Sequence, residues 1–83
     1  SRLATALADV GRRLEAGELW DKAVRLYRRA IELEPLAETW YRRLMDCLQQ
    51  QGETAEALRV YRRCCEALQA GLRTMPSRET EAR

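Results

Sequence analysis

The chain has 83 residues, 46% of them hydrophobic and 34% charged, and its fifteen basic and thirteen acidic side chains give a net charge of +2. This length allows one small domain, and the composition is that of a folded chain rather than a disordered one. The near balance of charge argues against a strong pull toward nucleic acid or membrane, and no run of eighteen apolar residues could span a bilayer. We therefore expect a cytoplasmic domain. Because the chain does not begin with Met, we also expect it to be cut from a longer protein.

The three cysteines, Cys47, Cys64 and Cys65, do not have the spacing of a metal site, and the chain contains no His. We expect no metal and no cofactor, and we interpret the odd number of cysteines as reduced cytosolic thiols. The alternative is a redox-sensing thiol. It is the weaker interpretation, because no His or metal is present to activate a thiol.

Apolar residues recur at helical spacing in the first half of the chain. Leu3, Leu7, Val10 and Leu14 follow one face of an expected helix over residues 2–16. A second stripe, which starts at Trp20, predicts a helix over residues 20–33.

Two further stripes predict helices over residues 36–51 and 54–70. The break after each of the four stripes contains Gly or Pro, which supply left-handed caps or stop a helix; these residues are Gly17, Pro35, Gly52 and Gly71. Linkers this short pack consecutive helices antiparallel.

The C-terminal segment has a cap of its own. Ser77 has the position of an N-cap, with Thr80 just inside the turn that follows. We expect the start of a fifth helix here, truncated at Arg83.

An internal repeat is the strongest signal in the chain. At an offset of 34 residues, positions 23–32 lie over positions 57–66 with six of ten residues identical. A helix–turn–helix unit with this period is typical of tetratricopeptide repeats. The predicted fold class is therefore all-α: a tetratricopeptide-like α-α superhelix of two helix hairpins and the start of a fifth helix.

We expect a single domain over residues 1–83, with one repeat at about 4–36, a second at about 37–70, and a loop with a truncated capping helix at 71–83. Small residues would let the helices approach closely, tyrosines would fill the gaps between hairpins, and a proline would set the angle of the next hairpin. The residues of this structural signature are Ala23, Tyr27, Ala30, Pro35, Ala57, Tyr61 and Cys64.

The second half of the chain resembles a narrower family. The segments Glu34–Glu38 and Tyr41–Met45, then Gly52–Leu58, then Tyr61–Cys64 with Leu68, and finally Leu72–Thr80 are similar in order and spacing to the bacterial transcriptional activator domain. The resemblance covers about residues 34–80. It implies a helical region of a large bacterial regulator that also carries a winged-helix DNA-binding domain and sometimes a nucleotide-binding domain.

Stacked hairpins present a concave surface lined by the first helix of each unit. Its mixed polar side chains suit a peptide, a neighbouring domain or a second copy of the chain, although an unused wet face fits the pattern equally well. On the repeat register these candidate partner-binding residues are Thr5, Arg12, Glu15, Thr39, Arg42, Asp46 and Gln49.

Two rows of arginine offer an alternative function. Arg25, Arg28 and Arg29 recur as Arg59, Arg62 and Arg63, and a basic stripe can bind nucleic acid. We favour instead a solvated outer face on which Glu32, Glu56 and Glu66 pair with the arginines at helical spacing. Direct contact with nucleic acid is therefore not the expected role, and neither is contact with a membrane.

No catalytic set is recognisable, because the chain has no His and no glycine-rich phosphate loop. We therefore expect not an enzyme but a protein-interaction module, the activator or oligomerisation region of a bacterial transcription regulator. Two units are fewer than such stacks usually need. Apolar surface should then stay open at the ends, where further helices of the parent protein or a homodimer partner would pack.

Overall fold

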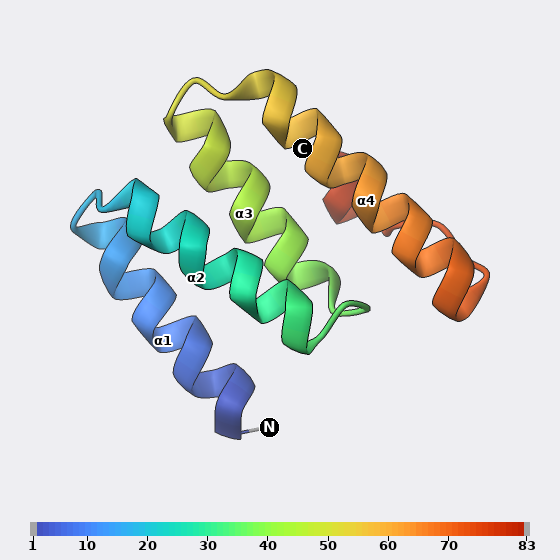
Figure 1. The fold of residues 1–83 in the computed structure, drawn as a ribbon, viewed down its shortest axis with the longest axis horizontal. Coiled ribbons are helices and arrows are strands. Elements are labelled where there is room, and N and C mark those ends of the chain that lie inside the picture. The colour runs from blue at the N-terminus through green and yellow to red at the C-terminus, as the bar shows by residue number, and fades with distance from the viewer. Residues whose placement is uncertain (1, 83) are drawn as a thin grey trace.

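A computed structural model describes residues 2–82 of the chain. It contains five helices: α1 (Arg2–Ala16), α2 (Trp20–Leu33), α3 (Glu38–Gln50), α4 (Thr54–Leu72) and α5 (Arg78–Glu81). The first four lie side by side and alternate in direction, while the short α5 lies behind them, near α3 and α4 (Figure 1). The described part of the chain has no strand, so the predicted all-α tetratricopeptide-like fold is confirmed.

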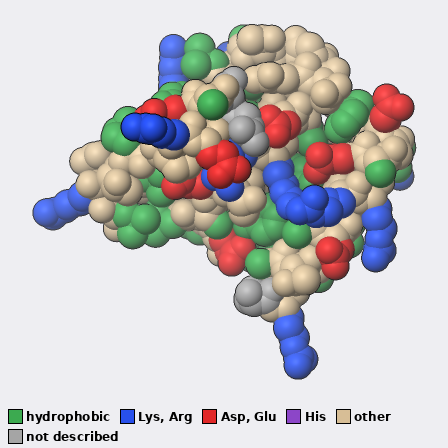
Figure 2. Space-filling view, turned by 180° about the vertical axis from the view of Figure 1, so that it is seen from behind, with side chains coloured by type: hydrophobic (Ala, Val, Ile, Leu, Met, Phe, Trp, Pro, Cys, Tyr) green, Lys and Arg blue, Asp and Glu red, His purple; other side chains and the backbone are tan. Residues whose placement is uncertain are grey.

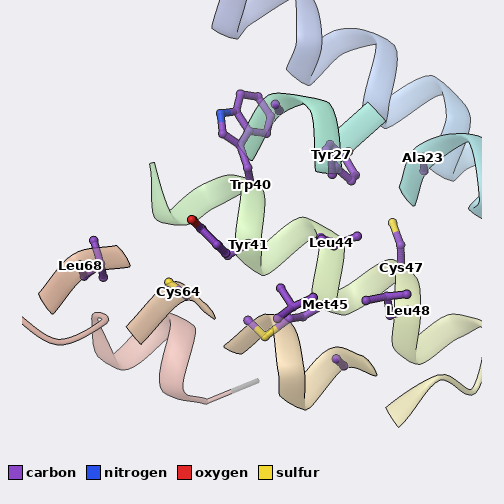
Figure 3. Close-up of a cluster of buried hydrophobic side chains, with 13 residues drawn as sticks. Ala23, Tyr27, Trp40, Tyr41, Leu44, Met45, Cys47, Leu48, Cys64 and Leu68 are labelled. Carbon is purple, nitrogen blue, oxygen red and sulfur yellow. The ribbon is translucent and has the colours of Figure 1, made fainter. Parts of the chain in front are cut away.

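The molecule is thin, with extents of 36 × 31 × 19 Å, as expected of one layer of helices. Its central element is α3, which packs against α2 on one side and against α4 on the other. Both flanks of α3 are therefore apolar, and its buried residues are Trp40, Tyr41, Leu44, Met45, Cys47 and Leu48 (Figure 3). In α1, which has a neighbour on one side only, the buried residue is Gly11.

The predicted small residues lie at the helix contacts. Ala23, Ala30 and Cys64 are fully buried, and Ala57 is 4% exposed. Tyr27 is also fully buried, and its ring stacks on Trp40 of the next hairpin at a centroid distance of 6.0 Å. Its repeat counterpart Tyr61 is only half-buried, because it lies on the outer flank of the last long helix.

Two of the expected glycine caps are wrong. Gly52 has a φ of 75° and turns the chain as predicted, but the left-handed residue after α1 is Glu18, next to Gly17. The left-handed residue after α4 is Arg73, and Gly71 lies inside the helix. The fourth helix therefore extends two residues beyond its predicted end.

Gly71 is small for a packing reason rather than a conformational one. A Cβ atom at this position would lie 2.7 Å from a methyl carbon of Leu36, so the loop before α3 rests directly on the end of α4. This loop also delays the start of α3, which begins at Glu38 rather than at residue 36. The Tyr41 hydroxyl donates to the Pro35 carbonyl oxygen at 2.7 Å and holds the loop in place.

Candidate protein-interaction face

The first helices of the two hairpins, α1 and α3, enclose two adjoining polar hollows, which we call the α1–α3 face. The first has a volume of about 360 Å³ and is lined by Arg12, Glu15, Thr39, Arg42, Arg43, Asp46 and Glu79. The second, of about 320 Å³, is lined by Glu15, Trp20, Asp46, Gln49 and Gln50. Six of the seven side chains predicted for the concave surface therefore lie together.

Thr5 is the exception, because it lies on α1 outside both hollows. Four lining residues do not belong to those seven: Trp20, Arg43, Gln50 and Glu79. Arg43 follows Thr39 at a spacing of four residues, so the helical register could have placed it there. No sequence signal could have placed Glu79, which comes from the far end of the chain.

One acidic residue of the face, Glu15, also forms a hydrogen bond with a residue of the core. The Tyr27 hydroxyl donates a hydrogen bond to the Glu15 carboxylate. Burial is the largest cause of the raised pKa of Tyr27, and the bond to Glu15 raises it further. Glu15 therefore anchors the buried tyrosine as well as lining the surface.

Arg43 is fixed by contacts to three other residues. Its guanidinium carbon lies 5.9 Å from the Tyr27 ring centre and 5.7 Å from that of Trp40, within the range of a cation–π interaction. It also donates to the Ala8 carbonyl oxygen of α1 at 3.3 Å. Arg43 thus links α1, α2 and α3 beneath the polar hollow.

The other two arginines of the face differ in exposure and in ion pairing. Arg42 has a side chain only 18% exposed, which pairs with Glu79 at 3.4 Å and donates to the Thr80 hydroxyl at 3.2 Å. Arg12 is exposed and forms no ion pair within residues 2–82. It is the base of the face that is best placed to meet an incoming acidic group.

The arginine rows lie on the second helices, α2 and α4, and three of the six arginines form ion pairs. Glu56 binds Arg28 at 2.9 Å across the two helices and Arg59 at 2.6 Å within α4, and Glu32 binds Arg29 at 2.7 Å. The hydrogen bonds from Arg59 and Arg28 hold the pKa of Glu56 below its usual value. The expected pairing of Glu66 is not found among the described residues.

Further hollows lie outside the α1–α3 face, and two of them include residues of α3 in their lining. One of about 530 Å³ runs between α2 and α4, with Tyr41 and Leu44 of α3 among its lining residues. The other, of about 590 Å³, has a mainly apolar wall formed by α3 and α4, and its lining includes Met45, Leu58 and Tyr61. Leu58 is 48% exposed there, so apolar surface is open on this flank of the molecule.

Two of the three thiols, Cys47 and Cys64, are buried in the core. Burial raises the pKa of the Cys47 thiol to about 12 and that of Cys64 to about 11, which opposes formation of a reactive thiolate. No three His, Cys, Asp or Glu side chains within residues 2–82 are grouped to hold a metal ion. None of the described helices is long and apolar enough to cross a membrane.

Acidic and basic side chains alternate over the side of the molecule that carries α5 (Figure 2). The molecule is thus a stack of two helix hairpins with the spacings noted in the sequence. Comparison with family models shows to which family the chain belongs. Residues 1–83 match the model of the bacterial transcriptional activator domain. The chain belongs to this family.

Membership of the bacterial transcriptional activator domain family confirms the resemblance found in the sequence, and it extends that resemblance from residues 34–80 to the whole chain. The family is one of regulatory domains, not of enzymes. No curated protein matches the chain, and no solved structure does.

Proposed function

We propose that this bacterial transcriptional activator domain works by binding protein through its α1–α3 face. The observation that carries the proposal is the convergence of the predicted side chains from α1 and α3 on two adjoining polar hollows. A surface with both acids and bases, fixed from below by Tyr27 and Arg43, suits a polar peptide or a neighbouring domain. Transcription regulation takes place on DNA, so a cytoplasmic location is part of the proposal.

The rival function is binding of nucleic acid through the arginine rows. Three of the six arginines are already paired with Glu32 or Glu56, which lowers the positive potential that a phosphate backbone would meet. The proposal therefore predicts only weak binding to duplex DNA. A dissociation constant below micromolar at physiological salt, with a steep salt slope, would favour the rival.

A reporter experiment tests the proposal itself. The chain is fused to the DNA-binding domain of an unrelated bacterial repressor, and transcription is measured from a promoter that carries the matching operator. We expect higher transcription than with the DNA-binding domain alone, because the fused chain brings a protein of the transcription machinery to the promoter. Equal transcription at equal expression of the two proteins would contradict the proposal.

A further inference from the structure

The segment that follows α4, which we call the strap (residues 73–82), is attached differently from the other helices. It turns away from α4 at Arg73, which has a φ of 52°. Pro76 and Thr80 are its buried residues, while Met75 is 54% exposed. The strap is thus fixed at two points and does not contribute a continuous apolar face to the core.

The anchor of the strap is a carboxylate of α3. Glu38 Oε1 accepts a hydrogen bond from the backbone N–H of Ser77 at 2.8 Å and another from the Thr80 hydroxyl at 2.8 Å. One helical turn farther along, Arg42 donates to Thr80 Oγ1 at 3.2 Å and pairs with Glu79 at 3.4 Å. The strap is therefore held on α3 mainly by polar side chains.

Polar attachment makes the strap easier to detach than the core helices. Each of these groups can exchange its partner for water, whereas the buried apolar residues of α3 cannot. Elements with few buried apolar contacts open with smaller free energies than the core of a folded domain. The strap, whose buried residues are Pro76 and Thr80, has this property, whereas α2, α3 and α4 each bury several apolar residues.

The strap contributes a residue to the lining of each of two hollows, so its release would change both. Glu79 lines the polar hollow of the α1–α3 face, while Glu81, two residues later, lines the apolar hollow between α3 and α4. Both hollows share α3 as a wall, through Thr39 and Arg42 on one side and Met45 on the other. The docked strap therefore lies at the boundary between a polar and an apolar surface.

We propose that residues 73–82 form a releasable strap, which divides the surface of α3 when docked through Glu38 and opens it as one continuous polar and apolar surface when released. Release removes the carboxylates of Glu79 and Glu81 from the two hollows and frees Arg42 from its partners. The strap is thus a built-in control on how much of α3 is accessible. This inference concerns the fold alone and does not depend on the proposed function.

Hydrogen exchange of the whole chain, measured residue by residue by NMR, tests the strap. The amides of Glu81 and Ala82 donate to the carbonyl oxygens of Ser77 and Arg78, so their exchange reports the integrity of α5. In the Glu38→Gln variant we expect these amides to exchange at least about tenfold faster, while those of α2 and α4 keep their rates. The glutamine keeps the size of the side chain but loses the charge that binds Ser77 and Thr80 and that lies near Arg42.

Glu66→Gln is the matched control, because it makes the same chemical change on an exposed residue of α4 and should leave the strap unaffected. Thr80→Val is a second test, which removes the buried hydroxyl but leaves Glu38 in place, and it should also accelerate exchange at residues 81 and 82. Unchanged exchange of the strap amides in Glu38→Gln and Thr80→Val would overturn the proposal. Equal acceleration throughout α3 and α4 would overturn it too, because the strap would then be part of one cooperative unit.

Discussion

Tyr27 of α2 lies directly against Gly11 of α1. A Cβ atom at Gly11 would lie 2.7 Å from the Cζ atom of the Tyr27 ring, closer than carbon atoms can pack. The glycine is therefore small because the tyrosine needs the space. The repeat counterpart of Gly11 is Met45, which is 2% exposed, and there the corresponding tyrosine, Tyr61, is only half-buried.

We predict that Gly11→Ala destabilises the domain although alanine favours helix. Overpacking costs about 1–3 kcal/mol, and the better helix propensity returns up to about 1 kcal/mol. Unfolding in urea, followed by circular dichroism, measures the difference. In the double variant Gly11→Ala with Tyr27→Leu, we expect the loss of unfolding free energy to be smaller than the sum of the losses in the two single variants. Strictly additive losses would contradict the close contact.

The cysteines provide a second prediction for single residues. Cys47 and Cys64 are fully buried and have raised pKa values of about 12 and about 11, whereas Cys65 is partly exposed. We expect iodoacetamide at pH 8 to modify Cys65 first and the other two at least about 100-fold more slowly. Fragment-ion mass spectrometry separates the adjacent Cys64 and Cys65. Equal rates in the native protein would show that the helical register is wrong.

At the scale of elements, the helices were easier to predict than their ends. Periodic apolar residues placed all four long helices, and Ser77 was correctly predicted as the cap of α5, where its hydroxyl accepts from the Thr80 amide at 3.5 Å. The left-handed residues Glu18 and Arg73 were not predicted, because glycine stands within two residues of each and is the usual choice. Packing decided the end of α4, where Gly71 stays helical so that Leu36 can rest on it.

The attachment of α5 should depend on pH. Burial alone would raise the pKa of Glu38, but the hydrogen bonds from Ser77 and Thr80, with the nearby charge of Arg42, outweigh burial and lower it. A group whose pKa is lowered by docking stabilises the docked state above its ordinary pKa of 4.5, and this stabilisation is lost as the pH falls through the lower value. The strap should therefore detach in acid.

The groups that face Glu38 are Arg42, Ser77 and Thr80, with Glu79 bound to Arg42 and the Cys64 thiol nearby on α4. NMR shifts of Thr80, followed from pH 7 to pH 3, should change before those of Ala57 in the core. In Glu38→Gln the early change should be largely lost, and an unaltered profile would exclude Glu38 as its cause.

For the whole molecule, the repeat predicted the stack and most of the α1–α3 face. One offset of 34 residues aligned the two hairpins and brought Arg12, Glu15, Thr39, Arg42 and Asp46 to a common hollow. It could not predict the contribution of Glu79, because the strap lies outside the repeat. The repeat also did not predict the ion pair between Arg28 and Glu56. These residues are 28 positions apart in the sequence and lie on different helices, whereas the sequence predicted pairing at helical spacing.

The most direct test of the α1–α3 face compares two charge reversals in the reporter fusion. Arg12→Glu alters the face, and Arg25→Glu makes the same change on the exposed side of α2; neither arginine forms an ion pair among the described residues. We predict that Arg12→Glu reduces transcription severalfold and that Arg25→Glu leaves it unchanged, at equal expression and equal thermal stability. Full activity of Arg12→Glu together with loss of activity in Arg25→Glu would show that the other face does the binding.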